Sequence, residues 1–291
     1  MIPISKGIFL LASLLLLGGC MEGSPDSMKN KTSEITNNSS ENSVSKSDQS
    51  SESSEKAEDS SVTPENGLTI DQVMDTVKNQ LETQVVIRLP TSIPLSNPLS
   101  NPNLHVSAAT VSDATSYHVI FFESKEPIPI NNNALNDPNQ ASQIVTISAL
   151  RYPSVSEANV AVGYQKADAG YENGAGGIDL GHGLTGYENA GAGSQFIGWN
   201  EGNWYLDVRS SLANTTQPGR QMATKIVEKL EKELLPAPNS VGKIQADVTD
   251  DKPNQTSIVW QEEDSVYTIE SSIDVLSTIG IATSFDDGAT D

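Results

Sequence analysis

Few residues in this chain have the types and spacing that catalysis requires. The three histidines, His105, His118 and His182, lie far apart in the sequence. Asp179 and His182 come nearest to a catalytic pair, but an Asp-x-x-His spacing in a loop often arises by chance. The sequence has no Gly-x-Ser-x-Gly elbow that would place a serine nucleophile beside a base. We therefore assign no catalytic residues and expect a protein that is not an enzyme.

Metal and cofactor sites have equally weak signals. A metal site needs several His, Cys or carboxylate ligands in register. The acidic pairs Glu262-Glu263, Asp250-Asp251 and Asp286-Asp287 lack the spacing of a calcium-binding loop, which favours solvated charge. The glycines at 174–177 are not followed by Lys-Ser or Lys-Thr, so they do not form a phosphate loop. We expect no metal and no cofactor.

Five aromatic residues are the candidate binding surface. If their rings were exposed on one face, they could bind a glycan or a peptide. The alternative is that they pack between sheet and helix, which the low aromatic content of 5% favours because the core has few other large rings. These residues are Trp199, Trp204, Tyr205, Trp260 and Tyr267.

Cys20 is the only cysteine, and its position indicates lipid chemistry. Lys6 precedes an apolar run from Gly7 to Leu17, and two glycines separate that run from the cysteine. A basic start, a short apolar run and small residues at a cleavage point are typical of a secretory signal. The run of roughly 11 residues is too short to span a bilayer, which needs about 20. We predict a signal peptide over residues 1–19.

The sequence Leu17-Gly18-Gly19-Cys20 resembles the bacterial lipobox. The resemblance implies that a fatty-acid-bearing diacylglycerol, palmitate being a typical acid, is attached to the Cys20 thiol and that the chain is cut before it. An ordinary secretory signal with a chance cysteine is the alternative. If the new amino terminus is also acylated, several acyl chains give stable anchoring where one gives only marginal binding. The predicted location is the outer, extracytoplasmic face of the cell membrane.

Residues 20–66 are expected to form a disordered tether. Ser, Asn, Glu, Lys, Asp and Thr dominate this stretch, which has no apolar periodicity and cannot bury enough surface to offset its ordering entropy. As a flexible coil it would reach roughly 40 Å. A polar spacer after a lipidated cysteine is similar to those of lipoproteins from Gram-positive Firmicutes.

The overall charge limits the partners. The formal net charge of −21 argues against nucleic acid, because phosphate contacts need clustered Lys and Arg. A single cysteine leaves no internal disulfide, so the core must depend on apolar burial alone.

The elements that must position any site follow from periodicity. Apolar spacing predicts a helix over 69–81 with Thr69 as its cap, a short helix over 154–165, a helix ended by Pro236 with the stripe Met222, Ile226, Leu230 and Leu234, and a helix over 273–284. Strands are predicted over 85–89, 116–123 and 143–152, with a Pro- and Asn-rich loop over 124–141. The glycine-dense stretch 167–193 is expected to be turns and loops.

An internal echo is the most informative pattern. Residues 196–208 and 257–269 both contain a Trp, then Asn or Gln, then Glu, a polar turn and a Tyr, and a helix follows each. Each copy predicts an antiparallel hairpin with Trp and Tyr near each other, and the first copy differs by one residue in the turn. The pattern resembles a repeated strand-strand-helix domain of unknown function found in extracytoplasmic membrane-anchored proteins. That resemblance implies no catalytic residues.

These observations predict an α+β fold, in which helices pack on one face of an antiparallel β-sheet. The sheet and helices could be divided between two related lobes. The expected divisions are the signal peptide at 1–19, the tether at 20–66, a main domain at 67–240 and a C-terminal unit at 241–291. The best hypothesis is a non-enzymatic binding or envelope-associated lipoprotein whose partners are the membrane, through Cys20, and a cell-wall or membrane-protein partner. The alternatives are an accessory factor that contacts another membrane protein in envelope stress or sporulation, and a hydrolase of cell-wall polymer.

Overall fold

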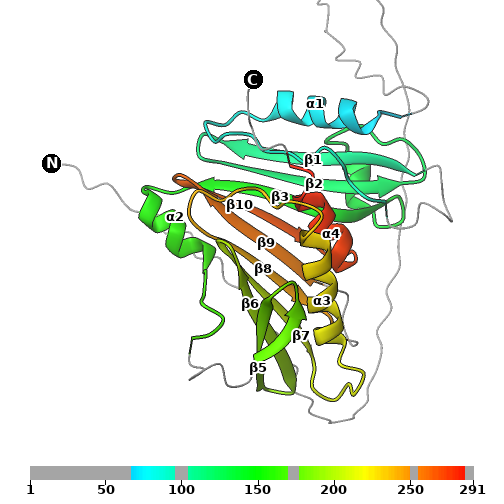
Figure 1. The fold of residues 1–291 in the computed structure, drawn as a ribbon. Helices are drawn as coiled ribbons and strands as arrows, with labels where there is room; N and C mark the ends of the chain where they lie inside the picture. Colours follow the sequence, from blue (N-terminus) through cyan, green and yellow to red (C-terminus); the bar gives the residue numbers. More distant parts are fainter. Residues whose placement is uncertain (1–66, 96–103, 170–176, 250–254, 286–291) are drawn as a thin grey trace, which may run out of the picture. The chain divides into compact units, whose positions relative to one another are not determined.

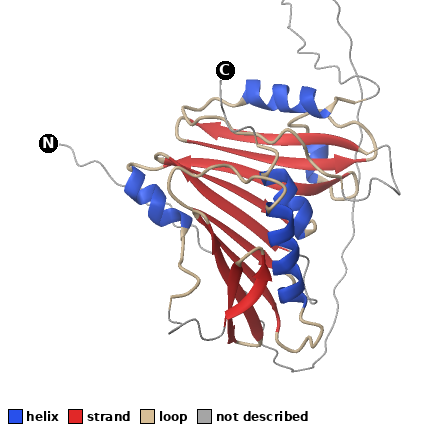
Figure 2. Cartoon of the chain, in the orientation of Figure 1, coloured by secondary structure: helices blue, strands red, loops and turns tan. Residues whose placement is uncertain are grey.

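The fold is built on one large sheet, seen in a computed structural model that describes residues 67–95, 104–169, 177–249 and 255–285. Ten strands lie in the order β1-β2-β3-β10-β9-β8-β7-β6-β5-β4 (Figures 1 and 2). The strands are β1 (His105–Asp113), β2 (Ser116–Ser124), β3 (Ala141–Arg151), β4 (Gly177–Gly181), β5 (Leu184–Gly191), β6 (Ser194–Glu201), β7 (Trp204–Ser211), β8 (Gly242–Asp247), β9 (Gln255–Glu262) and β10 (Ser265–Ser271). The helices are α1 (Ile70–Gln80), the 3-10 helix η1 (Asn133–Asn136), α2 (Val155–Val162), α3 (Pro218–Leu230) and α4 (Val275–Ala282).

The sheet is mixed, which corrects the expectation of a purely antiparallel one. Every pair of neighbouring strands is antiparallel except β7 and β8, which are parallel because α3 carries the chain back to the start of the next strand. The α+β class itself is confirmed. Residues 242–271, expected to start a C-terminal unit, supply three strands in the middle of the sheet, between β3 and β7.

Helices cover both faces of the sheet, unequally. Figure 1 shows α3 and α4 packed against the same face, over β6, β7 and β9. The helix α2 packs on the opposite face, where Ala158 and Val162 contact Val266, so the expectation that all helices lie on one face is wrong. The same face carries η1, where Leu135 packs with Phe122 and Ala141, and polar strand residues such as Lys243 and Gln245 remain at least partly accessible on it.

The predicted helices form where the capping signals place them. Thr69 caps α1 through a capping box with Gln72, with a 2.9 Å bond from the Thr69 N–H to Oε1 of Gln72 and a 3.3 Å bond in return. The helix α3 ends at Leu230, earlier than the stripe predicted, and Leu234 lies beyond it with 81% of its surface exposed. Pro236 therefore follows an irregular segment instead of ending the helix.

The two hairpins in the echo are confirmed, with equal turns, but the predicted Trp–Tyr pair forms only between Trp260 and Tyr267, because Trp199 lies opposite Leu206. β6 and β7 are joined by two residues, Gly202 and Asn203, and β9 and β10 are joined by Glu263 and Asp264. The one-residue difference between the copies therefore lies in the second strand and not in the turn. Successive strand residues point to opposite faces, so this difference reverses the direction in which Tyr205 points.

The glycine-dense stretch is partly sheet, which corrects the expectation of loops. Residues 177–191 form β4 and β5, joined by the turn residues His182 and Gly183 at φ of 52° and 78°. The following turn, at Ala192 and Gly193, also has positive φ at both residues, as hairpin turns of the I′ class require. The glycines at these turns permit tight hairpins, which periodicity alone did not reveal.

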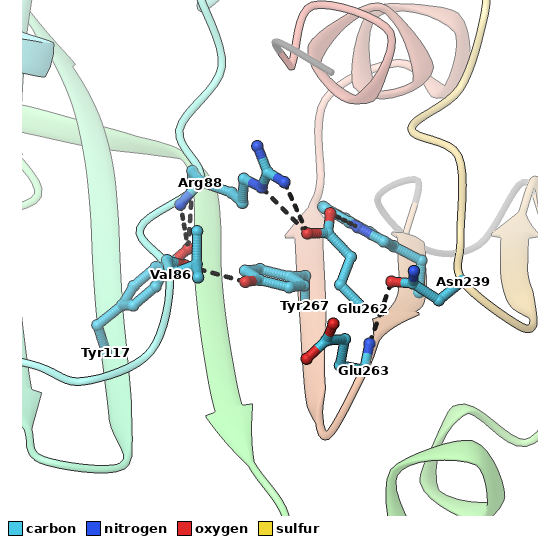
Figure 3. Close-up of polar contacts among 8 residues, drawn as sticks. Val86, Arg88, Tyr117, Asn239, Glu262, Glu263 and Tyr267 are labelled. Carbon is cyan, nitrogen blue, oxygen red and sulfur yellow. Dashed lines mark hydrogen bonds and ion pairs between the residues drawn. The ribbon is translucent and has the colours of Figure 1, made fainter. Parts of the chain in front are cut away.

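The predicted strand at 85–89 is not a strand. Its backbone bonds to two phenol hydroxyls instead of to a neighbouring strand (Figure 3). The Tyr117 hydroxyl donates to the Arg88 carbonyl at 2.8 Å and accepts from the Arg88 N–H at 3.1 Å, and the Tyr267 hydroxyl donates to the Val86 carbonyl at 3.0 Å. We call residues 85–91 the strap, because this segment crosses the buried tyrosines without joining the sheet.

The predicted signal peptide, Cys20 and the tether lie outside the described residues. Within the described part of the chain, no helix has both the length and the apolar character needed to cross a membrane.

Candidate functional site

The five aromatic residues considered as a binding surface are buried. Trp199 and Trp260 are fully buried, and Trp204, Tyr205 and Tyr267 are no more than 9% exposed. Trp260 stacks on Tyr267 with ring centroids 5.3 Å apart and meets Phe285 edge-on at the same distance. The three tryptophans and Tyr267 belong to the core between the sheet and the helices, so they do not form an exposed aromatic surface, while Tyr205 points to the other face of the sheet.

Asp179 and His182 do not form a catalytic pair. The Asp179 carboxylate accepts a 2.9 Å bond from the Gly181 N–H within its own hairpin turn. His182 lies instead beside Glu231 at the end of α3, with Nδ1 3.6 Å from the carboxylate. Each residue thus has a local structural contact, and no active site forms between them.

A cavity lies on the face of the sheet opposite α3. It has a volume of about 610 Å³ and extends across four neighbouring strands. Cavities of this size hold small molecules. Its strand residues are Tyr187 and Asn189 of β5, Phe196 and Gly198 of β6, Tyr205 and Asp207 of β7, and Lys243 and Gln245 of β8. We call this cavity the sheet pocket.

Strand alternation explains why these side chains meet. In β7, Leu206 and Val208 are buried toward α3, so Tyr205 and Asp207 point to the other face. The register places Tyr205 opposite Lys243 on the next strand, and Asp207 opposite Gln245. The polar side chains of Asp207 and Gln245 therefore lie side by side on neighbouring strands, next to the pair of Tyr205 and Lys243.

Gly198 makes room for Tyr205 on the pocket floor. A Cβ at this glycine would lie 3.0 Å from the Tyr205 hydroxyl oxygen and 3.2 Å from the ring. The Tyr205 ring therefore lies against the bare backbone of β6. Tyr205 lies one residue closer to its turn than Tyr267 does in the other hairpin, and it therefore points away from the face that α3 covers.

Asp207 is the electrostatic centre of the sheet pocket. Burial raises the pKa of its carboxyl to about 6, and Lys243 and the hydrogen bonds from Tyr205 and Gln245 oppose that rise. The carboxyl therefore changes charge near neutral pH, while the neighbouring Lys243 supplies a positive charge. Both properties favour recognition of a polar ligand over packing alone.

The loop after α2 forms one wall of the pocket, and Asn200 holds it. The Asn200 side chain accepts from the Ala167 N–H at 2.8 Å and donates to the Gln165 carbonyl at 3.0 Å. It also donates to the Tyr164 hydroxyl at 3.2 Å and, within its hairpin, to the Trp204 carbonyl at 3.3 Å. One amide thus fixes the wall to the end of β6.

The residues that line the sheet pocket limit the chemistry that they can assemble. Asp207 is the one carboxylate that lines it, so the two carboxylates of a glycosidase are not assembled among the described residues. Within the same described residues, no three His, Cys, Asp or Glu side chains are grouped to hold a metal ion. The pocket offers two lysines, one carboxyl, three side-chain amides and three aromatic rings.

Of the residues that line the pocket, the sequence analysis had proposed only Tyr205 as a binding residue and missed the others. The available signal was the alternation of polar and apolar residues in Trp204–Ser211 and Gly242–Asp247, which marks one face of each strand as polar. The sequence does not show that these two segments are neighbours, because α3 separates them.

Comparison of the chain with protein-family models, with curated protein sequences and with solved structures finds no match.

Proposed function

We propose that this protein is a lipid-anchored extracytoplasmic binding protein whose sheet pocket takes a small polar ligand. The observation that carries the proposal is the cavity of about 610 Å³ that places Asp207, Lys243, Tyr205 and Gln245 around one space on the face of the sheet opposite α3. The ligand is bound and released without covalent change.

The lining indicates the class of ligand. Lys243 and the Asn189 and Gln245 amides suit hydroxyl, carbonyl and carboxylate oxygens, and Asp207 accepts from hydroxyl or amide N–H groups. Phe196 offers an aromatic face beside these groups. A sugar that carries an amide, such as an N-acetylated amino sugar from cell-wall polymer, combines all of these features.

The sequence supports the location. The lipobox resemblance at Cys20, the signal peptide before it and the polar tether after it together favour a domain held away from the outer face of the membrane. The two hairpin–helix units, with equal turns and equivalent tryptophans, support an origin by duplication of one module, although they share one sheet.

The binding test uses the membrane-anchored protein in detergent, with N-acetylglucosamine and its short oligomers as probes. The expected result is a rise in unfolding temperature that grows with probe concentration. Lys243→Met and Asp207→Asn should weaken binding by tenfold or more. Lys225→Met, at an exposed position on α3, is the matched control and should bind as the unaltered protein does.

If the pocket variants bind the probes as well as the control does, the pocket assignment is wrong. Release of smaller products from the oligomers would instead support the hydrolase alternative.

The anchor is tested separately. Cys20→Ser should abolish labelling by a fatty-acid probe and move the protein from the membrane fraction to the soluble fraction. Unchanged labelling and fractionation would disprove lipidation at Cys20 without bearing on the pocket.

A further inference from the structure

The two hairpins share a Trp-x-Glu motif at the same structural position. Trp260 and Glu262 end β9, and Trp199 and Glu201 end β6, in each case directly before a two-residue turn. Both tryptophans are fully buried on the helix-covered face. The two glutamates are therefore equivalent positions in the echo, on the face opposite the sheet pocket.

In the second hairpin this glutamate binds an arginine. The Glu262 carboxylate accepts from the Trp260 indole N–H at 3.1 Å through one oxygen, Oε1. Its other oxygen accepts from Arg88 at 3.1 and 2.9 Å (Figure 3). Arg88 is presented by the strap, an extended segment. The motif thus forms a receptor for a guanidinium on extended backbone.

In the first hairpin, no lysine or arginine among the described residues pairs with the equivalent carboxylate. Burial raises the pKa of Glu201, and the charge of Glu231 raises it further. The Trp199 indole N–H, which points at the carboxylate, lowers the pKa. Oε2 of Glu201 and Nε1 of Trp199 are both buried without full hydrogen-bond geometry. Among the described residues, only His182 acts on this carboxyl as a positive group, and it lies beside Glu231.

No arginine of this chain is available to fill the position. The sequence contains four arginines, and all four form ion pairs elsewhere. Arg88 pairs with Glu262, Arg151 with Asp264, Arg209 with Asp247 and Arg220 with Glu188.

The surroundings of Glu201 suit an incoming arginine. A cavity of about 180 Å³ lies between Glu201 and the irregular segment after α3, with apolar walls that include Leu230, Leu234 and Pro236. Leu234 is 81% exposed, which leaves an apolar surface for the methylene stem of a long cationic side chain. Glu231 lies close enough for its charge to raise the pKa of Glu201, and Glu233, which also lines the cavity, is paired with Lys229 at 2.7 Å.

We propose that Glu201 and this cavity form a socket for an arginine presented on an extended segment of a partner protein, in the way that the strap presents Arg88 to Glu262. Guanidinium groups bind carboxylates through several directed bonds, so the socket selects arginine over lysine. The socket lies on the opposite face from the sheet pocket, so it could bind its partner while the pocket holds a ligand.

A stability comparison tests the first step. If Glu201 is kept unpaired for a partner, Glu201→Gln should raise the unfolding temperature of the isolated protein by about 2 to 4 °C, because it removes a half-buried charge. Glu262→Gln should lower the unfolding temperature, because it leaves Arg88 without its carboxylate. A loss of stability from Glu201→Gln equal to that from Glu262→Gln would mean that the carboxylate already has an internal partner, and the proposal would fall.

A binding experiment tests the occupant. The probe is the capped strap peptide of residues 85–91, Val-Val-Ile-Arg-Leu-Pro-Thr, titrated into the full-length protein in detergent while the indole N–H signals are followed by NMR. The signals of Trp199 and Trp204 should shift. Replacement of the peptide arginine by citrulline should abolish the shift, and replacement by lysine should weaken it.

The protein variants make the result specific. Glu201→Gln should reduce peptide affinity at least tenfold, and Glu228→Gln, an exposed glutamate on α3, should leave it unchanged. Peptide binding that survives Glu201→Gln or the citrulline replacement overturns the proposal, and so does the absence of binding at millimolar peptide. A shift confined to the Trp260 signal would show that the peptide only displaces the strap, and this result would also overturn the proposal.

Discussion

The strap is held by tyrosine hydroxyls, and removal of each hydroxyl should have a different cost. Tyr117 and Tyr267 are each 1% exposed, so replacement by phenylalanine keeps the ring packing and removes only the oxygen. Tyr117→Phe removes two bonds to the Arg88 backbone, and Tyr267→Phe removes one bond to the Val86 carbonyl. A hydrogen bond of this kind contributes about 1 kcal/mol net. We therefore expect losses of about 2 kcal/mol for Tyr117→Phe and about 1 kcal/mol for Tyr267→Phe.

Urea unfolding measures these losses, with the slope expected to be unchanged. For a folded domain of this size they correspond to decreases in unfolding temperature of about 4 to 8 °C and 2 to 4 °C. Hydrogen exchange adds a local check, because the Arg88 amide should lose protection in Tyr117→Phe and keep it in Tyr267→Phe. The double variant should cost less than the sum, since both hydroxyls hold the same segment.

The same hydroxyls make a prediction for alkaline pH. Burial raises the pKa of both Tyr117 and Tyr267, so each phenol stays neutral in the folded state at a pH where the unfolded chain ionises. Their contribution to stability is therefore complete below pH of about 10, the unfolded pKa, and is lost as pH rises above it. Equal losses in the two single variants, with the Arg88 amide still protected in both, would refute this account of the strap.

Three further changes test the packing and the pocket. Asp207→Asn should stabilise the protein at neutral pH by roughly 2 kcal/mol, because the raised pKa of this carboxyl makes its ionisation unfavourable to folding. Unfolding curves should show the gain disappearing below pH of about 4, and a gain of the same size at every pH would contradict the assignment. Gly242→Ala should destabilise by about 1 to 3 kcal/mol, because its Cβ would lie 2.5 Å from the rigid ring of Trp204, while Gly191→Ala, which meets open space, should change stability little. Asn200→Ala should increase hydrogen exchange at the Ala167 amide, and unchanged protection there would show that the loop does not depend on this side chain.

Local signals in the sequence predicted most of the elements. Thr69 as a cap and the spacing of Val73 and Val77 identified α1, and alternation identified β2, β3 and the two Trp hairpins. These features depend on residues that are close in the sequence, where period and capping chemistry are sufficient.

The arrangement in space could not be predicted in the same way. When Tyr205 is aligned with Tyr267, the two hairpins differ by one residue, and the sequence suggested that this residue lies in the turn. The turns are in fact equal in length, and the residue at the position equivalent to Tyr267 is Leu206. With a period of two residues, that difference places Tyr205 on the pocket face and not in the core. The strap shows the same limit, because its apolar run is typical of a strand while its actual partners, Tyr117 and Tyr267, are distant in sequence.

The pocket was missed because it depends on strand order. Asp207 and Gln245 lie opposite each other through the parallel pairing of β7 with β8 across the α3 crossover. Nothing local marks these two residues as neighbours, and the acidic character of the whole chain makes one more Asp unremarkable to sequence analysis.

The strand order also has a consequence for biogenesis. β8, β9 and β10 are the last strands to be synthesised, yet they lie between β3 and β7 and join the two outer groups of strands. A chain that emerges from a ribosome or a translocation channel would carry two separate partial sheets, with unpaired edges at β3 and β7, until residues 242–271 followed. Truncation before Gly242 should therefore produce an aggregating protein and not a smaller stable one, and it would also remove Lys243 and Gln245 from the sheet pocket.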